Sequence, residues 1–318
     1  MRGALGRIAR RLPERRRLAI AGGAVVLLVA LVVAGGAAYF AVGQGPDADA
    51  VAAVEADPSV SVDRTALGTA VRDGPVTDST VGLVYYPGAR VAHESYVPTA
   101  ADIVAASDRV ALVVVVEMPL NLAVLAPDRA DRVRERYPDA GVWAVGGHSL
   151  GGAMACRHAA ENAAAYDALA LHAAYCDRDV SESGLDVLSV LGDADGVIDA
   201  ERERASRSNL PADARIVELD GVNHAGFGAY GRQRGDDPAS LSPADSREAV
   251  GNVTGTWLAE LGGANRDVES RPISDRGSRP ASERGARSVS DRGPGPVSER
   301  DLRPSDSPRS SLPGERVF

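Results

Sequence analysis

The sequence predicts an α/β fold with a mostly parallel central sheet, helices on both of its faces and one transmembrane helix in front of it. Short apolar runs alternate with longer amphipathic segments between residues 81 and 261. The runs are nearly continuous in Val, Leu and Ala, which is typical of parallel strands that are buried on both faces. Alternating strands and helices predict a parallel sheet covered by helices on each side.

The first 43 residues predict a membrane anchor. Residues 1–17 contain seven Arg and one Glu, whereas residues 18–43 carry no charge. A bilayer core needs roughly 20 apolar residues, and the apolar region of a cleaved signal peptide is usually shorter, roughly 7–15 residues. We therefore expect a retained single-pass helix at 18–43. The positive-inside rule keeps the Arg-rich end in the cytoplasm, so the rest of the chain is expected outside the cell.

Residues 44–263 predict one acidic globular domain. They contain 34 Asp and Glu residues against 17 Arg, and the whole chain of 318 residues has no Lys. About 220 residues suffice for one sizeable core. This density of negative charge argues against nucleic acid as a partner. It suits a protein that stays hydrated in strong salt, and we expect a halophilic origin.

Six apolar runs and five amphipathic segments make up this domain. The expected strands lie at 81–86, 111–118, 142–145, 168–174, 187–191 and 216–219. The expected helices lie at 99–107, 121–137, 150–165, 197–208 and 244–261. Strands within 59–72 could add an antiparallel edge to the sheet.

Residues 264–318 predict a disordered tail. Four copies of an eight-residue unit begin at residue 272, starting with PISDRGSR and PASERGAR. The unit has almost no large apolar side chain, so burial cannot offset the entropy of ordering it. We expect low complexity without a specific role; a spacer or a surface for envelope contacts is the alternative.

The two cysteines, Cys156 and Cys176, are too few for a disulfide framework. Each lies in an apolar stretch of small residues, where a free Cys behaves as a small hydrophobe. We expect two buried thiols, with one bond between them as the alternative outside the cell.

A glycine-rich stretch follows the expected strand 142–145. Residues 146–152 read GGHSLGG and contain the pattern G-x-S-x-G around Ser149. In a nucleophile elbow a strand ends, the chain turns sharply at a strained serine and a helix begins. Glycine, which lacks a Cβ, tolerates the close approach of such a turn. Because a helix is expected from residue 150, the context favours an elbow over an ordinary glycine-rich turn.

His224 is the expected general base. A serine hydroxyl is a poor nucleophile without a base, and the base needs an orienting acid. His224 lies in the Gly-rich loop 221–228 after the expected strand 216–219, and α/β sheets build their sites at the carboxyl ends of strands. The other histidines lie before the elbow, within it, on the following helix or inside a buried strand: His93, His148, His158 and His172. The elbow histidine is expected to point away from the serine.

The orienting acid is expected between the serine and the histidine along the chain, as in other sites built on such an elbow. The stretch 191–199 offers three carboxylates: Asp193, Asp195 and Asp199. Asp195 sits in a D-G turn just past the strand and is preferred, with Asp193 next. The plain alternative is an acidic turn and a helix cap.

An oxyanion hole needs two backbone N–H groups. The N–H of Leu150, the residue after the nucleophile, is the expected first donor. The second is expected from the loop 85–91 after the first central strand, where Pro-Gly makes a tight turn. Ala89 is preferred and Arg90 is the fallback; an ordinary β-turn is the plain alternative.

Five stretches then carry a family resemblance, in order along the chain. They are YYPGARV (85–91), EMPLNLAV (117–124), GGHSLGGAMA (146–155), LGDADGV (191–197) and NHAGFGAYGRQRGD (223–236). With them the globular part resembles the α/β-hydrolase fold family, and within it a small group of uncharacterised bacterial and archaeal hydrolases.

The resemblance implies a serine hydrolase with Ser149, Asp195 and His224 as its catalytic triad. It also implies that Asn121 and the segment FGAYG (227–231) help to shape the pocket. Cys176 departs from the family pattern, in which a proline after Ala-Tyr is more usual. The anchor and the repeated tail lie outside the resemblance.

The expected function is that of a membrane-anchored esterase-like hydrolase acting on a small ester through an acyl-enzyme. It needs no organic cofactor, and the sequence shows no His/Cys cluster with metal-ligand spacing. The main alternative is a catalytically silent binding or scaffold module of the same fold at the cell surface. Thioesters, amides and peracid formation are further chemistries that the fold can host.

Overall fold

The computed structural model describes residues 28–32, 34–36, 38–39 and 41–269. By its internal contacts the chain divides into two units, Met1–Pro272 and Ile273–Phe318. The second unit, and with it the predicted tail from residue 270 onward, lies outside the described residues. The Arg-rich segment 1–17 also lies outside them.

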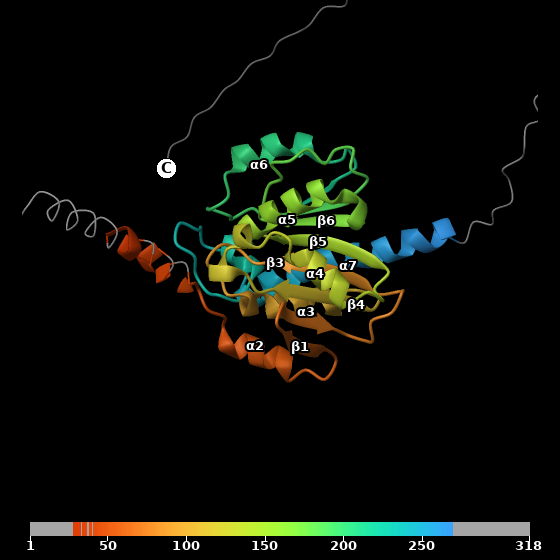
Figure 1. Cartoon of the computed structure of the whole chain (residues 1–318), viewed down its shortest axis with the longest axis horizontal. Helices are drawn as coiled ribbons and strands as arrows, with labels where there is room; N and C mark the ends of the chain where they lie inside the picture. The colour runs from red at the N-terminus through yellow and green to blue at the C-terminus, as the bar shows by residue number, and fades with distance from the viewer. Residues whose placement is uncertain (1–27, 33, 37, 40, 270–318) are drawn as a thin grey trace, which may run out of the picture. The chain divides into compact units, whose positions relative to one another are not determined.

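An eight-stranded sheet forms the centre of the described domain (Figure 1). Its strands are β1 (Ser61–Thr65), β2 (Gly68–Arg72), β3 (Val81–Tyr86), β4 (Ala111–Val116), β5 (Val142–His148), β6 (Ala168–His172), β7 (Asp186–Gly192) and β8 (Arg215–Leu219). They are ordered β1-β2-β4-β3-β5-β6-β7-β8. Strands β3 to β8 pair in parallel, whereas β1 and β2 are antiparallel. The predicted mostly parallel sheet with an antiparallel edge is therefore confirmed.

Five of the described helices fall close to the predicted positions, with two differences, and a sixth, α2, lies where no helix was expected. They are α2 (Ala48–Glu55), α3 (Val97–Ala105), α4 (Arg129–Arg136), α5 (Leu150–Glu161), α6 (Ala200–Ser206) and α7 (Pro243–Glu269). The expected helix 121–137 is wrong in its first half: two 3-10 turns precede α4, because Leu120 and Asn121 adopt a φ of 54° and Pro127 cannot donate to a helical ladder. Helix α7 continues past the expected end at 261, so residues 264–269, which were expected in the disordered tail, are helical.

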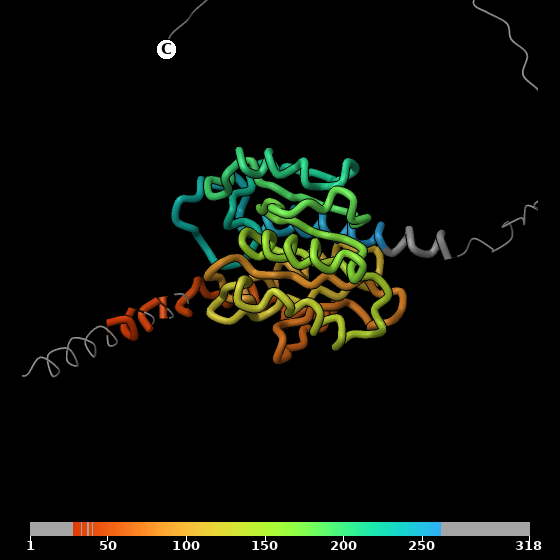
Figure 2. Tube along the Cα trace, turned by 45° about the horizontal axis from the view of Figure 1, so that its top comes forward, coloured from red at the N-terminus to blue at the C-terminus, as the bar shows by residue number. Residues whose placement is uncertain are grey.

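Helices cover both faces of the sheet, and an apolar core lies between the sheet and each layer of helices. One core packs α3 and α7 against the sheet around Trp257 and Phe227. The other packs α4 and α5 against the opposite face around Trp143 and Met154. Figure 2 shows α4 and α5 in front of the sheet and α7 behind it. The continuous apolar strands predicted this burial, since side chains of both parities must then face a helix layer.

The predicted transmembrane helix at 18–43 is described only in part. Residues 18–27, 33, 37 and 40 lie outside the described residues. The described residues from 28 to 41 are helical, and Leu28, Leu31 and Val32 are exposed. Within the part of the chain that the structure describes, no helix is both long and apolar enough to cross a membrane.

The expectation of two free thiols is wrong. Cys156 on α5 and Cys176 after β6 form a disulfide, and both residues are fully buried. Apolar surroundings were a poor guide because a disulfide is itself well accommodated in a core. What decides is the distance between the two Cα atoms, 5.5 Å, which the sequence does not reveal.

Candidate active site

Ser149 occupies a sharp turn between β5 and α5. Its φ of 55° and ψ of −124° lie in a backbone region that residues other than glycine rarely adopt, at a cost of about 1–3 kcal/mol. Two backbone hydrogen bonds hold the turn: its N–H donates to the carbonyl of His172 at 2.9 Å, and its carbonyl accepts from Ala153 at 3.1 Å. A strained serine fixed between a strand and a helix has the geometry of a nucleophile elbow.

The glycines on either side of Ser149 let the elbow pack directly on the end of β3. A Cβ added to Gly147 would lie 2.4 Å from the carbonyl oxygen of Tyr86, and one added to Gly151 would lie 2.2 Å from the same oxygen and 2.5 Å from that of Pro87. These are backbone atoms that cannot swing aside. The stretch GGHSLGG therefore uses glycine for close backbone approach as well as for turning.

Asp195 and His224 meet at the carboxyl ends of β7 and β8. Oδ2 of Asp195 lies 2.7 Å from Nδ1 of His224, and both side chains are 2% exposed. The other carboxylate oxygen, Oδ1, accepts from the backbone N–H groups of Val197 and Ile198 at 2.8 and 2.9 Å. The turn after β7 thus aims one oxygen at the imidazole by holding the other.

The two competing carboxylates do other work. Oδ1 of Asp193 accepts from the N–H of Gly221 at 2.6 Å, which ties the end of β7 to the loop before His224. Asp199 caps α6 and accepts from the N–H groups of Glu201 and Arg202. Of the three candidates for the orienting acid, only Asp195 contacts the imidazole.

The second nitrogen of His224 has no partner in the described structure. Nε2 is buried and makes no hydrogen bond there, and none is present between His224 and Ser149. The ring of His148, next to Ser149 in the chain, lies 4.4 Å from the ring of His224, centroid to centroid. The imidazole of His224 is therefore beside the elbow, with no hydrogen bond to Ser149. Such bonds are often long before substrate binds.

The elbow histidine packs inward. His148 is 1% exposed, stacks on Phe227 at 5.3 Å and hydrogen-bonds through Nδ1 to the hydroxyl of Tyr96 at 2.8 Å. Burial, followed by the neighbouring histidines His224 and His172, lowers its pKa well below the usual value. His148 is thus a neutral packing group at neutral pH.

The remaining three histidines are engaged elsewhere. His172 lies between the hydroxyls of Tyr85 and Thr254, and burial lowers its pKa to about 3. His158 contacts Asp131. His93 contacts Thr69 and Glu94.

The loop after β3 distinguishes the two candidates for the second oxyanion donor. The N–H of Arg90 donates to the carbonyl of Asn121 at 2.9 Å, whereas that of Ala89 makes no hydrogen bond within the described residues. The N–H of Gly88 donates to the hydroxyl of Tyr96 at 3.0 Å. Ala89 alone of these three has a free N–H, and it is exposed. Leu150, the other expected donor, is the first residue of α5, where N–H groups lack helical partners.

Two contacts of the site were missed from the sequence. Tyr96 joins the loop at Gly88 to the elbow at His148, and nothing in the sequence marks it, since its pattern is that of an ordinary core residue. Asp236 accepts backbone N–H groups from both site loops. It is the last residue of the stretch NHAGFGAYGRQRGD, so the resemblance contained a signal for it.

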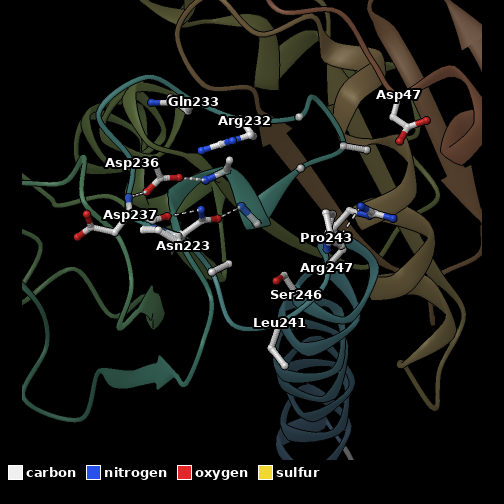
Figure 3. Close-up of a pocket in the computed structure, with 17 residues that line it drawn as sticks. Asp47, Asn223, Arg232, Gln233, Asp236, Asp237, Leu241, Pro243, Ser246 and Arg247 are labelled. Carbon is white, nitrogen blue, oxygen red and sulfur yellow. Dashed lines mark hydrogen bonds between the residues drawn. The ribbon is translucent and has the colours of Figure 1, made fainter.

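A cavity of ≈460 Å³ lies beside the loop of His224 (Figure 3). Its lining includes Asn223, Arg232 and Arg247, but none of the expected catalytic residues. Three residues of the segment FGAYG line it, Gly228, Ala229 and Gly231, whereas Ser149, Asp195 and His224 do not. Among the described residues no group of three or more His, Cys, Asp or Glu side chains could hold a metal ion.

Comparison with known families agrees with this architecture. The model of the alpha/beta hydrolase family matches residues 82–248, more than half of the chain. The chain therefore belongs to the α/β hydrolase family. No curated protein matches it.

Solved structures of similar fold include several hydrolases. Carboxyl esterase 2 of Tuber melanosporum is 12% identical with a TM-score of 0.47, over 65% of this chain and 88% of that one. The esterase domain of a Rhodothermus marinus protein is 16% identical with a TM-score of 0.43, over 63% and 97%. A prolyl endopeptidase is 13% identical with a TM-score of 0.43, over 64% and 39%.

Proposed function

We propose that this α/β hydrolase is a serine hydrolase that forms an acyl-enzyme at Ser149. One observation carries the proposal: a strained serine lies beside a buried carboxylate–imidazole pair whose outer nitrogen, Nε2 of His224, has no partner in the described structure. A buried nitrogen without a partner is costly, and the Ser149 hydroxyl beside it is the partner that this mechanism supplies.

In this mechanism His224 first acts as a base. Its Nε2 takes the proton of the Ser149 hydroxyl as Oγ attacks the carbonyl carbon of an ester, while Asp195 holds Nδ1–H and stabilises the imidazolium. The N–H groups of Leu150 and Ala89 stabilise the oxyanion. The imidazolium gives its proton to the departing alcohol. His224 then activates water, which hydrolyses the acyl-enzyme and regenerates the serine.

A small ester is the proposed substrate class. Residues 173–185, which connect β6 to β7, form no helix and so supply no lid of their own. Without a helical lid from this connection, we favour small substrates over long acyl chains. Thioesters and amides share the same acyl chemistry and belong in the same assay panel.

We also propose that residues 18–43 anchor the enzyme in the cell membrane with the catalytic domain outside. The support is the uncharged run behind seven arginines. The Cys156–Cys176 disulfide adds to it, since such bonds persist mainly in oxidising compartments outside the cytoplasm. Recovery of the chain in carbonate-washed membranes, with the domain cleaved by protease on intact cells, is the expected result. A chain that is fully released by carbonate, or protected in intact cells, would contradict the anchor or its orientation.

The decisive test of the activity is labelling with a fluorophosphonate probe in detergent and high-salt buffer. The full-length wild type is expected to be labelled, and Ser149→Ala is expected not to be. Ser95→Ala is the matched control, because it removes a buried hydroxyl that has no hydrogen-bond partner in the described structure and should leave labelling intact. A folded wild type that resists the probe would instead favour the silent binding module.

A further inference from the structure

The carboxylate of Asp236 lies between the two loops that carry the candidate acid and base. Its Oδ1 accepts from the N–H of Gly196 at 3.2 Å and from that of His224 at 3.1 Å, and its Oδ2 accepts from Ala225 at 2.8 Å. Gly196 directly follows Asp195. One side chain thus holds the backbone of both members of the carboxylate–imidazole pair.

Backbone N–H groups are the donors to the Asp236 carboxylate among the described residues. Its Oδ1 also accepts from the N–H of Asp237 at 3.1 Å, so four backbone donors reach the carboxylate, three at Oδ1 and one at Oδ2. No ion pair of the described residues includes Asp236. Hydrogen bonds from N–H groups to an ionised carboxylate are stronger than neutral ones, which makes the bridge stiff.

The loop that carries Asp236 is itself closed. The side chain of Asn223 accepts from the N–H of Gly226 at 3.0 Å and donates to the carbonyl of Asp237 at 2.7 Å. Figure 3 shows Asp236 and Asn223 side by side, joined by hydrogen bonds to this loop. The segment from Asn223 to Asp237 therefore forms a loop whose ends are hydrogen-bonded to each other, which places the carboxylate of Asp236 next to the backbone of His224.

We infer that Asp236 is a positioning residue. Its carboxylate fixes the position of the turn after Asp195 relative to the backbone of His224, and this orients the imidazole toward Ser149. The inference rests on the proposed function, because aiming matters only if His224 acts as a base. An ordinary loop carboxylate would tie neighbouring residues, whereas Asp236 reaches 40 positions back along the chain to Gly196.

Asp236→Asn tests this role. The amide keeps one acceptor oxygen but presents N–H donors to the N–H of Ala225, so the bridge cannot close on both oxygens. We expect kcat for a small ester to fall about tenfold to a hundredfold with KM nearly unchanged, since a misplacement of about 1 Å at a site can cost that much. Asp236→Glu, which keeps the charge and shifts the carboxylate by one methylene, should lower kcat in the same way and serves if the amide variant fails to fold.

Asp237→Asn is the matched control. It removes the same charge one residue along, from an exposed carboxylate that makes no hydrogen bond within the described residues. It should change kcat less than about threefold. Equal losses from the two amide variants would assign the effect to charge alone and overturn the inference.

A spectroscopic readout separates this inference from the proposed function. The proton on Nδ1 of His224, held by Asp195, should give a far-downfield resonance in the wild type that moves or broadens in Asp236→Asn and stays in Asp237→Asn. A wild type that shows the resonance but resists the fluorophosphonate probe would sink the proposed function, while movement of the resonance in Asp236→Asn would still show that Asp236 holds the carboxylate–imidazole pair. An unchanged resonance with unchanged kcat in Asp236→Asn would sink the positioning role alone.

Discussion

The two halves of the candidate site are built by different means. In the acid–base half, the carboxylates of Asp193, Asp195 and Asp236 accept backbone N–H groups and so fix the loops around His224. In the nucleophile half, which comprises the elbow at Ser149 and the loop at residues 87–90, close backbone contact and packed rings set the geometry. Hydrogen bonds to carboxylates hold the acid–base half, whereas close packing holds the nucleophile half.

The difference teaches how an acidic chain without lysine can use its charge. Most carboxylates of the described residues form no salt bridge with an arginine, and those in the site accept backbone donors. Such bonds can be weakened by replacing a single carboxylate with an amide. Shape is different: a Cβ at Gly151 meets backbone oxygens that cannot move. Activity should therefore be lost from the acid–base half when a carboxylate is neutralised. It should be lost from the nucleophile half when the disulfide is opened or the packing is changed.

The largest effect should come from Asp195→Asn. The amide leaves the shape of the turn nearly intact but can offer N–H instead of an acceptor to Nδ1 of His224, which favours the wrong tautomer. We expect kcat/KM for a small ester to fall on the order of 10⁴-fold, the size of effect known for this substitution in a serine protease triad. Steady-state kinetics on purified full-length protein measure it.

Asp193→Asn provides the contrast. It weakens one bond, from the N–H of Gly221, and touches no imidazole atom. A fall in kcat/KM of less than about tenfold is expected, since one neutral hydrogen bond remains possible. If Asp193→Asn were as damaging as Asp195→Asn, the orienting role would not belong to Asp195.

The difference between Asp193 and Asp195 shows which part of the site the sequence predicts and which part it does not. The order of strands and helices, the elbow and the acidic turn follow from apolar runs and glycine spacing, because these are local patterns. Which of Asp193, Asp195 and Asp199 meets His224 is decided by the turn after β7, where two N–H groups hold Oδ1 of Asp195. The D-G turn favours Asp195 from the sequence alone, but its contact with His224 depends on the position of a loop 29 residues away, which no local pattern contains.

The same reason explains what the sequence missed. The Cys156–Cys176 bond, the reach of Asp236 and the bridge through Tyr96 are all contacts between segments distant in the chain. The helix expected at 121–137 failed for a local reason, positive φ at two residues that are neither Gly nor Pro. The family resemblance nevertheless singles out the stretch that ends at Asp236.

Reduction of the disulfide should have the next largest effect. The Cys156–Cys176 bond joins α5, directly behind the elbow, to the segment after β6 and closes a loop of 20 residues. Opening it should lower the free energy of unfolding by about 3 kcal/mol. Urea unfolding with and without a reductant measures the loss, and the double variant Cys156→Ala/Cys176→Ala should not respond to reductant at all. An unfolding midpoint that reductant leaves unchanged in the wild type would show that the bond is not a stabilising part of this half.

Tyr96→Phe should weaken the nucleophile half more gently. The hydroxyl of fully buried Tyr96 accepts from Gly88 and contacts Nδ1 of His148, so its loss leaves a buried N–H without a partner at a cost of about 1–3 kcal/mol. Since Gly88 precedes the candidate oxyanion donor Ala89, kcat should fall about 5- to 30-fold while KM changes little.

Tyr166→Phe is the matched control for this variant. Its hydroxyl is also buried and bonds Asp131 and His158, on the opposite core and away from the elbow. A similar loss of stability with unchanged kcat is expected. If both variants lowered kcat equally, the effect of Tyr96 would be one of general stability rather than of the loop at Gly88.

Replacing Asp102 on α3 should have the smallest effect, and it should stabilise the fold rather than weaken it. In the described structure the carboxylate of Asp102 accepts no backbone N–H group, unlike the carboxylates of the acid–base half. Burial raises its pKa to about 6, against the attraction of Arg247 and with the repulsion of Glu248, both on α7. An unfolded Asp titrates near a pKa of about 3.9, so between about pH 4 and pH 6 the folded state binds more protons and stability falls as the pH rises.

Asp102→Asn should remove this slope and raise the free energy of unfolding at pH 7 by about 1 kcal/mol, less than for a fully buried group because solvent screens a partly exposed carboxylate. Urea unfolding at pH 4 and at pH 7 measures both effects, with the exposed Asp108→Asn as the control that should change neither. A variant less stable than the wild type at pH 7 would mean that attraction to Arg247 outweighs burial. Asp102 would then join the carboxylates that stabilise this fold, and backbone donors would not be what separates the acid–base half from the rest of the chain.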